Sequence, residues 1–580
     1  VAGSVILKNQ ISQYLSENGF DCEPGDFFGQ EVVTVSISIS GHAVELMLLV
    51  EDRFLSLPKF LILEPSKYGK LAHVNIERIE DVEVGVVCVN ASDAVSVNFD
   101  QPLFLVRDSL KRHIALLDLV ISDPDWNERE LLREFYSNWL ILCNSEQKPL
   151  LINFSQPVLQ RVDVYEPLEK VQYGLHSYFV AHPSDSEISK LSEMQFAIKE
   201  KKRKVAGKAV VIPIDRLAPA PSMNESIEDW YLDTINSLSD ERLRQLREQF
   251  GQWRDKHYWV VFTAITVDNN RTWFALKLDC ENKKTLPLSA RKFKGWRLTP
   301  ISVRVFEQEN VVQRGGGSTF LEDKKVAVVG IGSIGSEVAH KLAAAGVRHL
   351  HLIDPDFYQI DNLHRHMLPQ AYVDMPKSMG MVYQCHAQFP WSDARYSGES
   401  LLTFVEKYPR DFFDLIVIAV GNPSHERFFK QYLLDNKIDV TTLNCWLEGF
   451  GVGGHAVLDI SGKDGCLLCA YVDHTDGSRG LQSNLNFIEA NQDVMKSIAG
   501  CGNQFISYGA ASSAQTAVMA SSLAIRYLEG KQTDSCKVSW KGDDDDAQAE
   551  NIKLTHRYYQ FRESLKRLPL LNEDCDVCSH

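Results

Sequence analysis

A short run of glycines between an apolar strand and a helix constrains this chain more than any other feature. Lys325 to Val329 is an apolar run of the kind that forms a buried parallel strand. It leads into the sequence Gly330-Ile331-Gly332-Ser333-Ile334-Gly335, and a helical pattern then runs from Ser336 to about Ala345. Glycines suit this turn because a phosphate group must approach bare backbone N–H groups at the N-terminus of a helix. The segment therefore predicts an α/β nucleotide-binding site.

The residues after the next strand indicate which chemistry that site performs. The second apolar strand, His349 to Ile353, ends in Asp354, which follows Gly335 by 19 residues and is placed to bind ribose hydroxyls. Acidic, amide and basic side chains follow, namely Asp356, Asp361, Asn362, Arg365 and Lys377. A nicotinamide dehydrogenase needs neither the arginine nor the lysine. Attack of a carboxylate on an α-phosphate does need cations on the polyphosphate and acidic groups for Mg²⁺.

This series resembles the D-x-D…N-L-x-R…K series of the ThiF/MoeB/ubiquitin-activating superfamily, whose members adenylate the C-terminal glycine of a ubiquitin-like protein. The resemblance implies a Rossmann-like adenylation domain that binds ATP and Mg²⁺, with catalytic roles for Arg365 and Lys377. The residues expected to hold the nucleotide are Gly330, Gly332, Gly335, Asp354, Asp356, Asn362, Arg365 and Lys377. In this superfamily an arginine upstream of the first strand can also reach a nucleotide, often across a dimer. Arg314 stands there, although a plain linker arginine explains it equally well.

One position departs from the superfamily pattern. The apolar strand Phe413 to Val420 ends at Gly421-Asn422-Pro423, where members of the superfamily usually carry an aspartate for Mg²⁺. Three explanations stay open. Asp354 or Asp356 holds the metal, Asn422 serves as a neutral ligand, or adenylation is weakened.

Two pairs of cysteines predict a structural zinc site. They are Cys466 with Cys469 and, after a gap of 105 residues, Cys575 with Cys578. Two C-x-x-C pairs offer four thiolates on two tight turns, which is the arrangement that tetrahedral Zn²⁺ requires. The spacing is too long for a zinc finger, so the metal would clip the C-terminal segment to the core. The resemblance agrees, because relatives carry such a split site.

Between the two pairs, Cys501 stands among glycines ahead of a small-residue helix, 510–528. In the superfamily this is the place of the cysteine that accepts the adenylated glycine, and a nearby helix N-terminus would favour the thiolate. A structural cysteine in a turn is the alternative. Cys536 is a weaker candidate.

The first 148 residues resemble a ubiquitin-conjugating domain. A helix (6–18), strand-like runs (31–40 and 42–51), a proline-bounded strand and C-terminal helices (103–121 and 127–142) follow in that order. The loop-like stretch 71–75 contains His73-Val74-Asn75 and precedes Cys88. The resemblance makes Cys88 the thioester-carrying nucleophile and Asn75 the oxyanion stabiliser. The motif departs from the family's His-Pro-Asn, and Cys88 is also explained as a buried cysteine among valines.

Length and composition bound the remaining possibilities. A chain of 580 residues has room for three or four domains. A net charge of −16 argues against nucleic-acid binding, because the phosphate backbone would repel it. No membrane-spanning run and no signal peptide are recognised, so we expect a cytoplasmic protein whose twelve cysteines are thiols or metal ligands.

We therefore predict three domains: a ubiquitin-conjugating-like α+β domain (1–148), an α+β linking domain (149–308) and a ThiF-like adenylation domain (309–580). Both functional halves on one chain resemble the E1–E2 fusions of bacterial CBASS anti-phage operons. Such fusions activate the C-terminus of a cGAS-like nucleotidyltransferase (CD-NTase) and ligate it to target amines, the side chains of lysines. The implied route is adenylation, transfer to Cys501, transfer to Cys88 and attack by a lysine, in a homodimer. A sulfur-carrier activator and a nucleotide-binding scaffold without catalysis are the alternatives.

Overall fold

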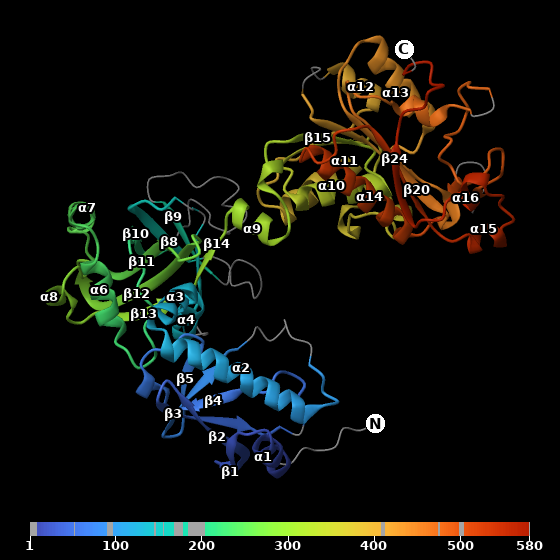
Figure 1. Cartoon of the computed structure of the whole chain (residues 1–580). Helices are drawn as coiled ribbons and strands as arrows, with labels where there is room; N and C mark the ends of the chain where they lie inside the picture. The colour runs from blue at the N-terminus through green and yellow to red at the C-terminus, as the bar shows by residue number, and fades with distance from the viewer. Residues whose placement is uncertain are drawn as a thin grey trace. The chain divides into compact units, whose positions relative to one another are not determined.

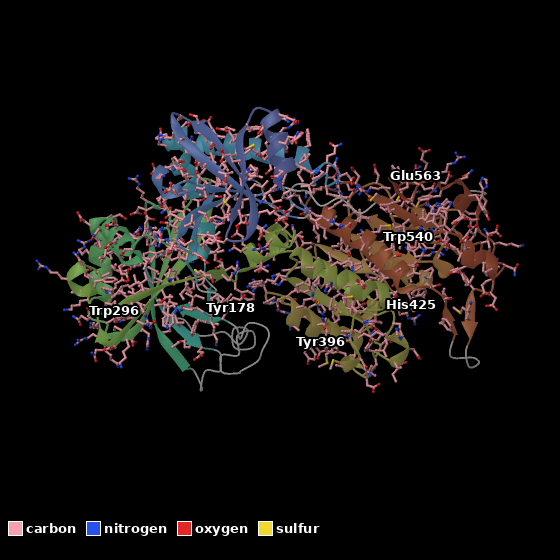
Figure 2. The ribbon with its side chains drawn as sticks, turned by 90° about the horizontal axis from the view of Figure 1, so that it is seen from below. Tyr178, Trp296, Tyr396, His425, Trp540 and Glu563 are labelled. Atoms are coloured by element: carbon pink, nitrogen blue, oxygen red, sulfur yellow. The ribbon has the colours of Figure 1, made fainter. Side chains whose placement is uncertain are left out.

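In the computed structural model the chain forms two compact units, residues 1–306 and 307–580, and each is described by itself (Figure 1). The structure describes residues 8–51, 53–89, 97–143, 147–152, 154, 156–166, 178–183, 204–407, 412–473, 476–497 and 504–578. Each unit has its own apolar core. Trp296 belongs to a core of the first unit and Trp540 to one of the second, and both are labelled in Figure 2. Within the described ranges no helix is both long and apolar enough to cross a lipid bilayer.

The first unit begins with a six-stranded antiparallel sheet in the order β1-β2-β3-β4-β6-β5. Its strands are β1 (Asp21–Phe27), β2 (Gln30–Ile39), β3 (His42–Leu49), β4 (Phe60–Leu63), β5 (Val74–Ile79) and β6 (Val82–Val87). Helices α1 (Lys8–Glu17) and α2 (Pro102–Ser122) contribute buried side chains to the core on one face of this sheet. The predicted first helix, the two strand runs after it and the long helix near residue 110 are confirmed.

Two details of this sheet differ from the prediction. Strand β1 was not expected, because its sequence contains Pro24 and Gly25, which are rare inside strands. It is tolerated because β1 lies at the edge of the sheet. The expectation of a loop over residues 71–75 is wrong for Val74 and Asn75, which begin the opposite edge strand, β5.

The helix expected over residues 127–142 is two helices, α3 (Pro124–Arg133) and α4 (Phe135–Leu142). Helix α4 packs into the core of the next sheet rather than onto the first. Phe135 and Trp139 are fully buried there, and the Trp139 indole N–H donates to the carbonyl oxygen of Ile301 at 3.2 Å. The end of the predicted first domain is therefore a physical part of the linking domain.

The linking domain contains an eight-stranded sheet in the order β13-β12-β11-β10-β8-β9-β7-β14. The strands are β7 (Leu150–Ile152), β8 (Gln160–Glu166), β9 (Phe179–Pro183), β10 (Lys204–Pro213), β11 (Asp255–Ile265), β12 (Arg271–Lys284), β13 (Arg297–Ile301) and β14 (Val303–Val305). Helices α6 (Ile227–Asn236) and α7 (Asp240–Phe250) begin at Ser226 and Ser239, whose side chains accept a backbone N–H. Together with these two helices and the short helix α8 (Ala290–Phe293), the sheet gives the linking domain the predicted α+β character.

The second unit is built on an eight-stranded sheet in the order β17-β16-β15-β18-β19-β20-β23-β24. Its strands are β15 (Lys325–Val329), β16 (His349–Ile353), β17 (Arg395–Ser397), β18 (Leu415–Ile418), β19 (Thr442–Leu447), β20 (Gly453–Asp459), β23 (Cys536–Lys541) and β24 (Leu565–Pro569). The five strands from β17 to β19 are parallel, and the remaining pairs are antiparallel. A small pair, β21 (Met495–Ser497) and β22 (Gln504–Ile506), stands apart.

Helices cover both faces of this sheet, which explains why its parallel strands are continuous apolar runs. One core receives side chains from α10 (Ser333–Ala345), α11 (Lys377–Gln388) and α14 (Ala510–Leu528), and the opposite core from α12 (Leu401–Lys407) and α13 (Pro423–Asp435) (Figure 1). The other helices are α9 (Gln308–Arg314), α15 (Asp545–Ala549) and α16 (His556–Gln560). Because β15, β16 and β18 are parallel neighbours, the segments that follow them meet at the same end of the sheet, where these strands have their carboxyl ends.

Candidate functional site

The turn between β15 and α10 has the shape that the glycine pattern predicts. Gly330 has a φ of 83°, where a side chain would be strained, and a Cβ there would lie 2.7 Å from the carbonyl oxygen of Ala419. A Cβ on Gly335 would overlap the carbonyl oxygen of Gly330. At Gly332, which caps α10, a Cβ would meet no atom within 4 Å. The helix N-terminus is therefore open at Gly332, where a phosphate group could approach the backbone.

Asp354 holds this turn in place from the end of β16. Its carboxylate is 5% exposed, and its two oxygens accept the backbone N–H of Ile331 at 2.6 Å and of Asp356 at 2.8 Å. Burial raises the pKa of Asp354, against the opposing effect of those two hydrogen bonds and of the nearby Lys377 ammonium. The side chain predicted to bind ribose thus also fixes the glycine turn.

Lys377 and Asp356 form an ion pair at the start of α11. The Lys377 Nζ lies 2.9 Å from the Asp356 Oδ2, and the Lys377 backbone N–H donates to the Asp356 carbonyl oxygen at 2.9 Å. The lysine side chain is only 12% exposed, whereas that of Asp356 is 67% exposed. A partly desolvated ammonium and an accessible carboxylate therefore stand together beside the glycine turn.

Arg365 is connected to the glycine turn by an aromatic residue, Tyr508, that the sequence patterns did not single out. Its guanidinium lies over the ring of Tyr508, with the Cζ 5.4 Å from the ring centroid. The Tyr508 hydroxyl lies 3.0 Å from the Oγ of Ser333, in the first turn of α10. Tyr508 thus connects the predicted phosphate-binding helix with the predicted phosphate-binding arginine. No motif marks it, because the contact joins segments 175 residues apart.

Asn362 and His366 shape the segment that carries Arg365. The Asn362 Oδ1 accepts the backbone N–H of Gln359 at 3.0 Å, which closes a short 3₁₀ turn, Ile360–Asn362. The His366 Nε2 donates to the carbonyl oxygen of Ile331 at 2.7 Å, and its Nδ1 accepts from Leu368 at 3.1 Å. Burial lowers the pKa of His366 to about 4, so the imidazole is neutral. This histidine, which sequence reasoning missed, ties the arginine segment to the glycine turn.

Asn422, at the departure from the superfamily pattern, caps helix α13. Its Oδ1 accepts the backbone N–H groups of Ser424 at 3.1 Å and His425 at 3.2 Å. Glu426, in the first turn of the same helix, is 2% exposed and accepts a hydrogen bond from the Asn444 Nδ2 at 3.0 Å. Burial raises the pKa of Glu426 to about 7. The segment after β18 is thus held by a cap and a buried carboxyl.

The four zinc-candidate cysteines come together as predicted. The sulfur atoms of Cys466, Cys469, Cys575 and Cys578 all lie within 4.8 Å of one another, although the two pairs are far apart in sequence. A bidentate ion pair between Arg479 and Asp576 fastens the C-terminal turn. The four sulfurs are the donor set that suits a structural Zn²⁺ ion, and their grouping fits one ion without leaving a further ligand position.

Cys88 lies at the end of β6 with its side chain exposed. Its backbone N–H donates to the carbonyl oxygen of His73 at 2.8 Å, so Cys88 lies across from His73, just ahead of β5. The His73 Nδ1 lies 2.6 Å from the Glu134 Oε1 and its Nε2 lies 3.4 Å from the Glu130 Oε2. The hydrogen bond to Glu134 raises the pKa of His73. The alternative of a buried structural cysteine at position 88 does not fit this exposure. Asn75 is half-buried in β5, paired with Val86.

The remaining candidates are placed as follows. Arg314 is exposed at the end of α9. Cys501 lies outside the described residues, between β21 and β22 in the sequence. Cys536 is buried in β23, and burial raises the pKa of its thiol to about 11, so its suggestion as a nucleophile is wrong.

Two family matches coincide with the two candidate sites. Residues 310–575 match the ThiF family, and residues 7–147 match prokaryotic E2 family B. The chain therefore combines an E1-like domain with an E2-like domain, and it is a transferase of the ubiquitin-activating and ubiquitin-conjugating type.

Full-length similarity points to one group of such fusions. The chain is homologous to the ATP-dependent ubiquitin transferase-like protein Cap2 of Escherichia coli strain TW11681, with 24% identity over 552 residues, 88% of each chain. It also resembles the adenylyltransferase and sulfurtransferase MOCS3 of Oryza sativa subsp. japonica, with 42% identity over 72 residues, 12% of this chain and 16% of that protein. Among solved structures, Escherichia coli MccB is similar over 47% of this chain and 69% of its own, at 16% identity and a TM-score of 0.33.

Proposed function

We propose that the chain uses ATP to adenylate the C-terminal glycine of a protein partner and then carries the acyl group on cysteines to a target amine. The partner we propose is the CD-NTase of an anti-phage operon, and the acceptors are lysine side chains. The protein would work as a homodimer.

The observation that supports the adenylation step is that several groups come together at the carboxyl ends of the parallel strands of the second sheet. The open helix N-terminus at Gly332, the partly buried ammonium of Lys377 and the guanidinium of Arg365 all belong to segments that follow β15 and β16. Such groups would stabilise the negative charge that develops as the partner's carboxylate attacks the α-phosphorus and pyrophosphate leaves.

For the metal, the accessible carboxylate of Asp356 is the ligand we favour for Mg²⁺. The two alternatives fit less well. The Asn422 oxygen already accepts two backbone N–H groups, and the Asp354 oxygens accept one each. When bound, Mg²⁺ would neutralise phosphate charge.

The transfer steps keep the acyl group activated. The Cys501 thiolate attacks the carbonyl of the acyl-adenylate and AMP leaves. The Cys88 thiolate then attacks the Cys501 thioester and frees the Cys501 thiolate. Finally, a lysine amine attacks the Cys88 thioester, the Cys88 thiolate leaves, and the amine loses a proton as the amide bond forms. Asn75 would donate a hydrogen bond to the oxyanion at Cys88.

Exchange of labelled pyrophosphate into ATP, in the presence of the partner protein, tests the adenylation step. We expect Lys377→Ala to lower this exchange by about 100-fold, because it removes a cation that binds the transition state. Lys531→Ala is the matched control, since Lys531 is 60% exposed and paired with Glu529 away from the site. Unchanged exchange in Lys377→Ala would contradict the assignment.

A further inference from the structure

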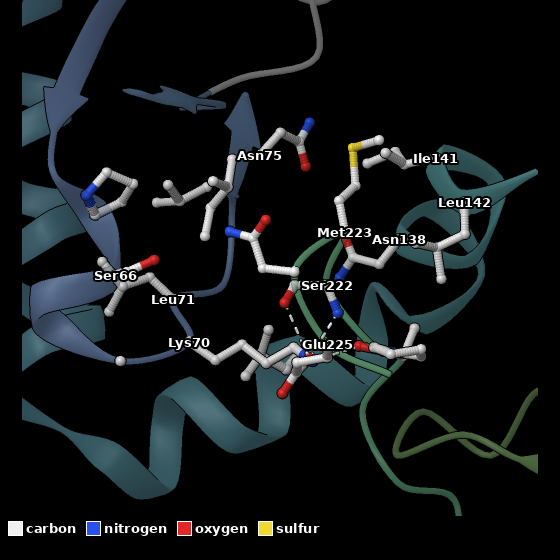
Figure 3. Close-up of a pocket in the computed structure, with 18 residues that line it drawn as sticks. Ser66, Lys70, Leu71, Asn75, Asn138, Ile141, Leu142, Ser222, Met223 and Glu225 are labelled. Atoms are coloured by element: carbon white, nitrogen blue, oxygen red, sulfur yellow. Dashed lines mark hydrogen bonds and ion pairs between the residues drawn. The ribbon is translucent and has the colours of Figure 1, made fainter. Parts of the chain in front are cut away.

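A pocket of about 260 Å³ lies within the first unit, along strand β5 of the E2-like domain (Figure 3). One wall is strand β5 with the segment before it. The other wall comes from helix α4 and from the segment 220–225 of the linking domain. The lining includes Asn75, Ile76, Asn138, Ile141 and Met223. The linking domain thus contributes to the surroundings of strand β5.

The strand register places this pocket close to Cys88. Cys88 is hydrogen-bonded to His73, and Val74, the next residue after His73, is one of the residues that line the pocket. A strand advances by roughly 3.3 Å per residue, so Ile76 lies about 10 Å along the strand from the position opposite Cys88. A chain whose last carbonyl is attached to the Cys88 sulfur would therefore reach the pocket with about its third or fourth residue from the end.

The wall formed by β5 can pair with an extended chain. In the described part of the sheet β5 pairs with β6 alone, and it lies at the edge. Because the His73–Cys88 pair is hydrogen-bonded, the alternation of an antiparallel ladder turns the backbone groups of Val74, Ile76 and Arg78 away from β6. Free N–H and C=O groups at a sheet edge are a template for strand addition.

The opposite wall carries apolar side chains among polar ones, and it is held in place. Met223 is 66% exposed and Ile141 is 44% exposed, and both border the pocket together with the amide side chain of Asn138 (Figure 3). The segment that carries Met223 is fastened to the E2-like domain, because the Lys70 ammonium donates to the Ala220 carbonyl oxygen and lies 2.7 Å from the Glu225 carboxylate. Apolar side chains with interspersed amides suit a peptide, whose side chain needs an apolar contact and whose backbone needs hydrogen bonds.

We propose that this pocket binds the extended C-terminal tail of the protein substrate while its last carbonyl is attached to Cys88. The tail would add to the free edge of β5, antiparallel to it, with an apolar side chain about three residues from its end seated against Met223 and Ile141. This inference rests on the proposed role of Cys88. The donor tail fits better than an acceptor segment, because the tail's distance from Cys88 is fixed by the covalent bond whereas acceptor lysines stand in varied surroundings.

The test uses the full chain without ATP, so that it does not depend on adenylation. A short synthetic peptide ending in cysteamine is joined to Cys88 as a disulfide, and peptide mapping verifies the position. One peptide has leucine about three residues from its end, and a second has serine there. Titration with glutathione measures how strongly each adduct resists reduction. We expect the leucine peptide to resist reduction about tenfold better than the serine peptide, the size expected for burial of one apolar side chain.

Two variants remove the pocket by different means. Met223→Arg places a charge in the apolar wall, and Ile76→Pro removes an edge N–H without removing a ladder hydrogen bond. Both should abolish the preference for leucine. Val267→Arg, at a 45% exposed apolar position of the linking domain that does not line the pocket, should keep it. Equal resistance of the two peptides in the parent chain, or a leucine preference that survives both pocket variants, would overturn the assignment. The relay itself is scored separately with ATP and the partner protein, so failure of that reaction would contradict the proposed function and leave the tethering result to decide this inference.

Discussion

Tyr508 contacts both the predicted phosphate-binding helix and the predicted phosphate-binding arginine of the E1-like domain. Its ring lies under Arg365 and its hydroxyl contacts Ser333. A cation over an aromatic ring contributes about 0.5–2 kcal/mol. We therefore expect Tyr508→Leu to raise the KM for ATP in pyrophosphate exchange by about tenfold, because Arg365 loses its support.

Tyr508→Phe separates the ring from the hydroxyl. It keeps the ring under Arg365 and removes only the contact with Ser333. We expect a KM close to that of the parent, within about threefold, since a neutral hydrogen bond contributes about 1 kcal/mol or less. Equal losses in the leucine and phenylalanine variants would show that the hydroxyl, not the ring, is the important group.

Glu426 gives the second unit a pH-dependent stability. Its pKa is raised by burial from 4.5 to about 7 in the folded chain. Between these values the folded state holds a proton that the unfolded state releases, so the free energy of unfolding falls as the pH rises through this window. The full change is roughly 3 kcal/mol, from 1.36 kcal/mol per pKa unit.

Glu426→Gln removes this ionisation and keeps an oxygen that can accept from Asn444. We expect the free energy of unfolding of the second unit in the parent, relative to this variant, to fall between about pH 5 and about pH 7. Glu406→Gln changes an exposed carboxyl on α12 and serves as the control. A difference between parent and Glu426→Gln that stays constant or rises over that pH range would contradict the assignment.

At the scale of elements, the two cysteine turns tie the chain's C-terminal segment to the 3₁₀ turn at Leu467–Tyr471. We expect one zinc ion per chain by metal analysis. Cys469→Ser should lose the metal and lower the unfolding temperature of the second unit by several degrees, because metal binding stabilises only the folded state. Cys280→Ser, in strand β12 of the first unit, is the matched control. A parent chain that contains no zinc and unfolds at the same temperature as Cys469→Ser would contradict this prediction.

The sequence predicted best the elements whose bounds are determined by a single physical cause. Strands β15 and β16 have the predicted bounds because both faces are buried, and the Gly332 turn follows from backbone geometry. Helix α10 begins at Ser333, earlier than the predicted Ser336, because the glycine turn itself supplies its first residues. Tertiary contacts decided the rest. Strand β5 forms because β6 pairs with it, and α4 separates from α3 as Phe135 enters the second core.

The sequence likewise predicted one part of the candidate site and missed another. Charged residues in a fixed series, such as Asp356 and Lys377, can be found along the sequence, and the structure brings these two within ion-pair distance. Tyr508 and His366 could not be found in this way, because each acts through a contact with a distant segment. The pocket beside Asn75 could not be predicted from the sequence either, since residues 220–225 of its wall come from a domain without a recognisable motif.

At the scale of the whole molecule, the chain joins an E1-like domain and an E2-like domain through a linking domain. The linking domain shares a core with α4 and builds part of the pocket near Cys88. This arrangement is compatible with the proposed passage of one acyl group from the E1-like half to the E2-like half.

The most direct test of that claim is the mass of the protein after incubation with ATP, Mg²⁺ and the CD-NTase partner, compared among the parent, Cys88→Ala and Cys501→Ala. We predict a thiol-sensitive adduct at both cysteines in the parent, an adduct at Cys501 alone in Cys88→Ala, and none in Cys501→Ala. An adenylate without any thioester, or a persulfide at Cys501 with no role for Cys88, would contradict the relay and favour a sulfur-carrier activator.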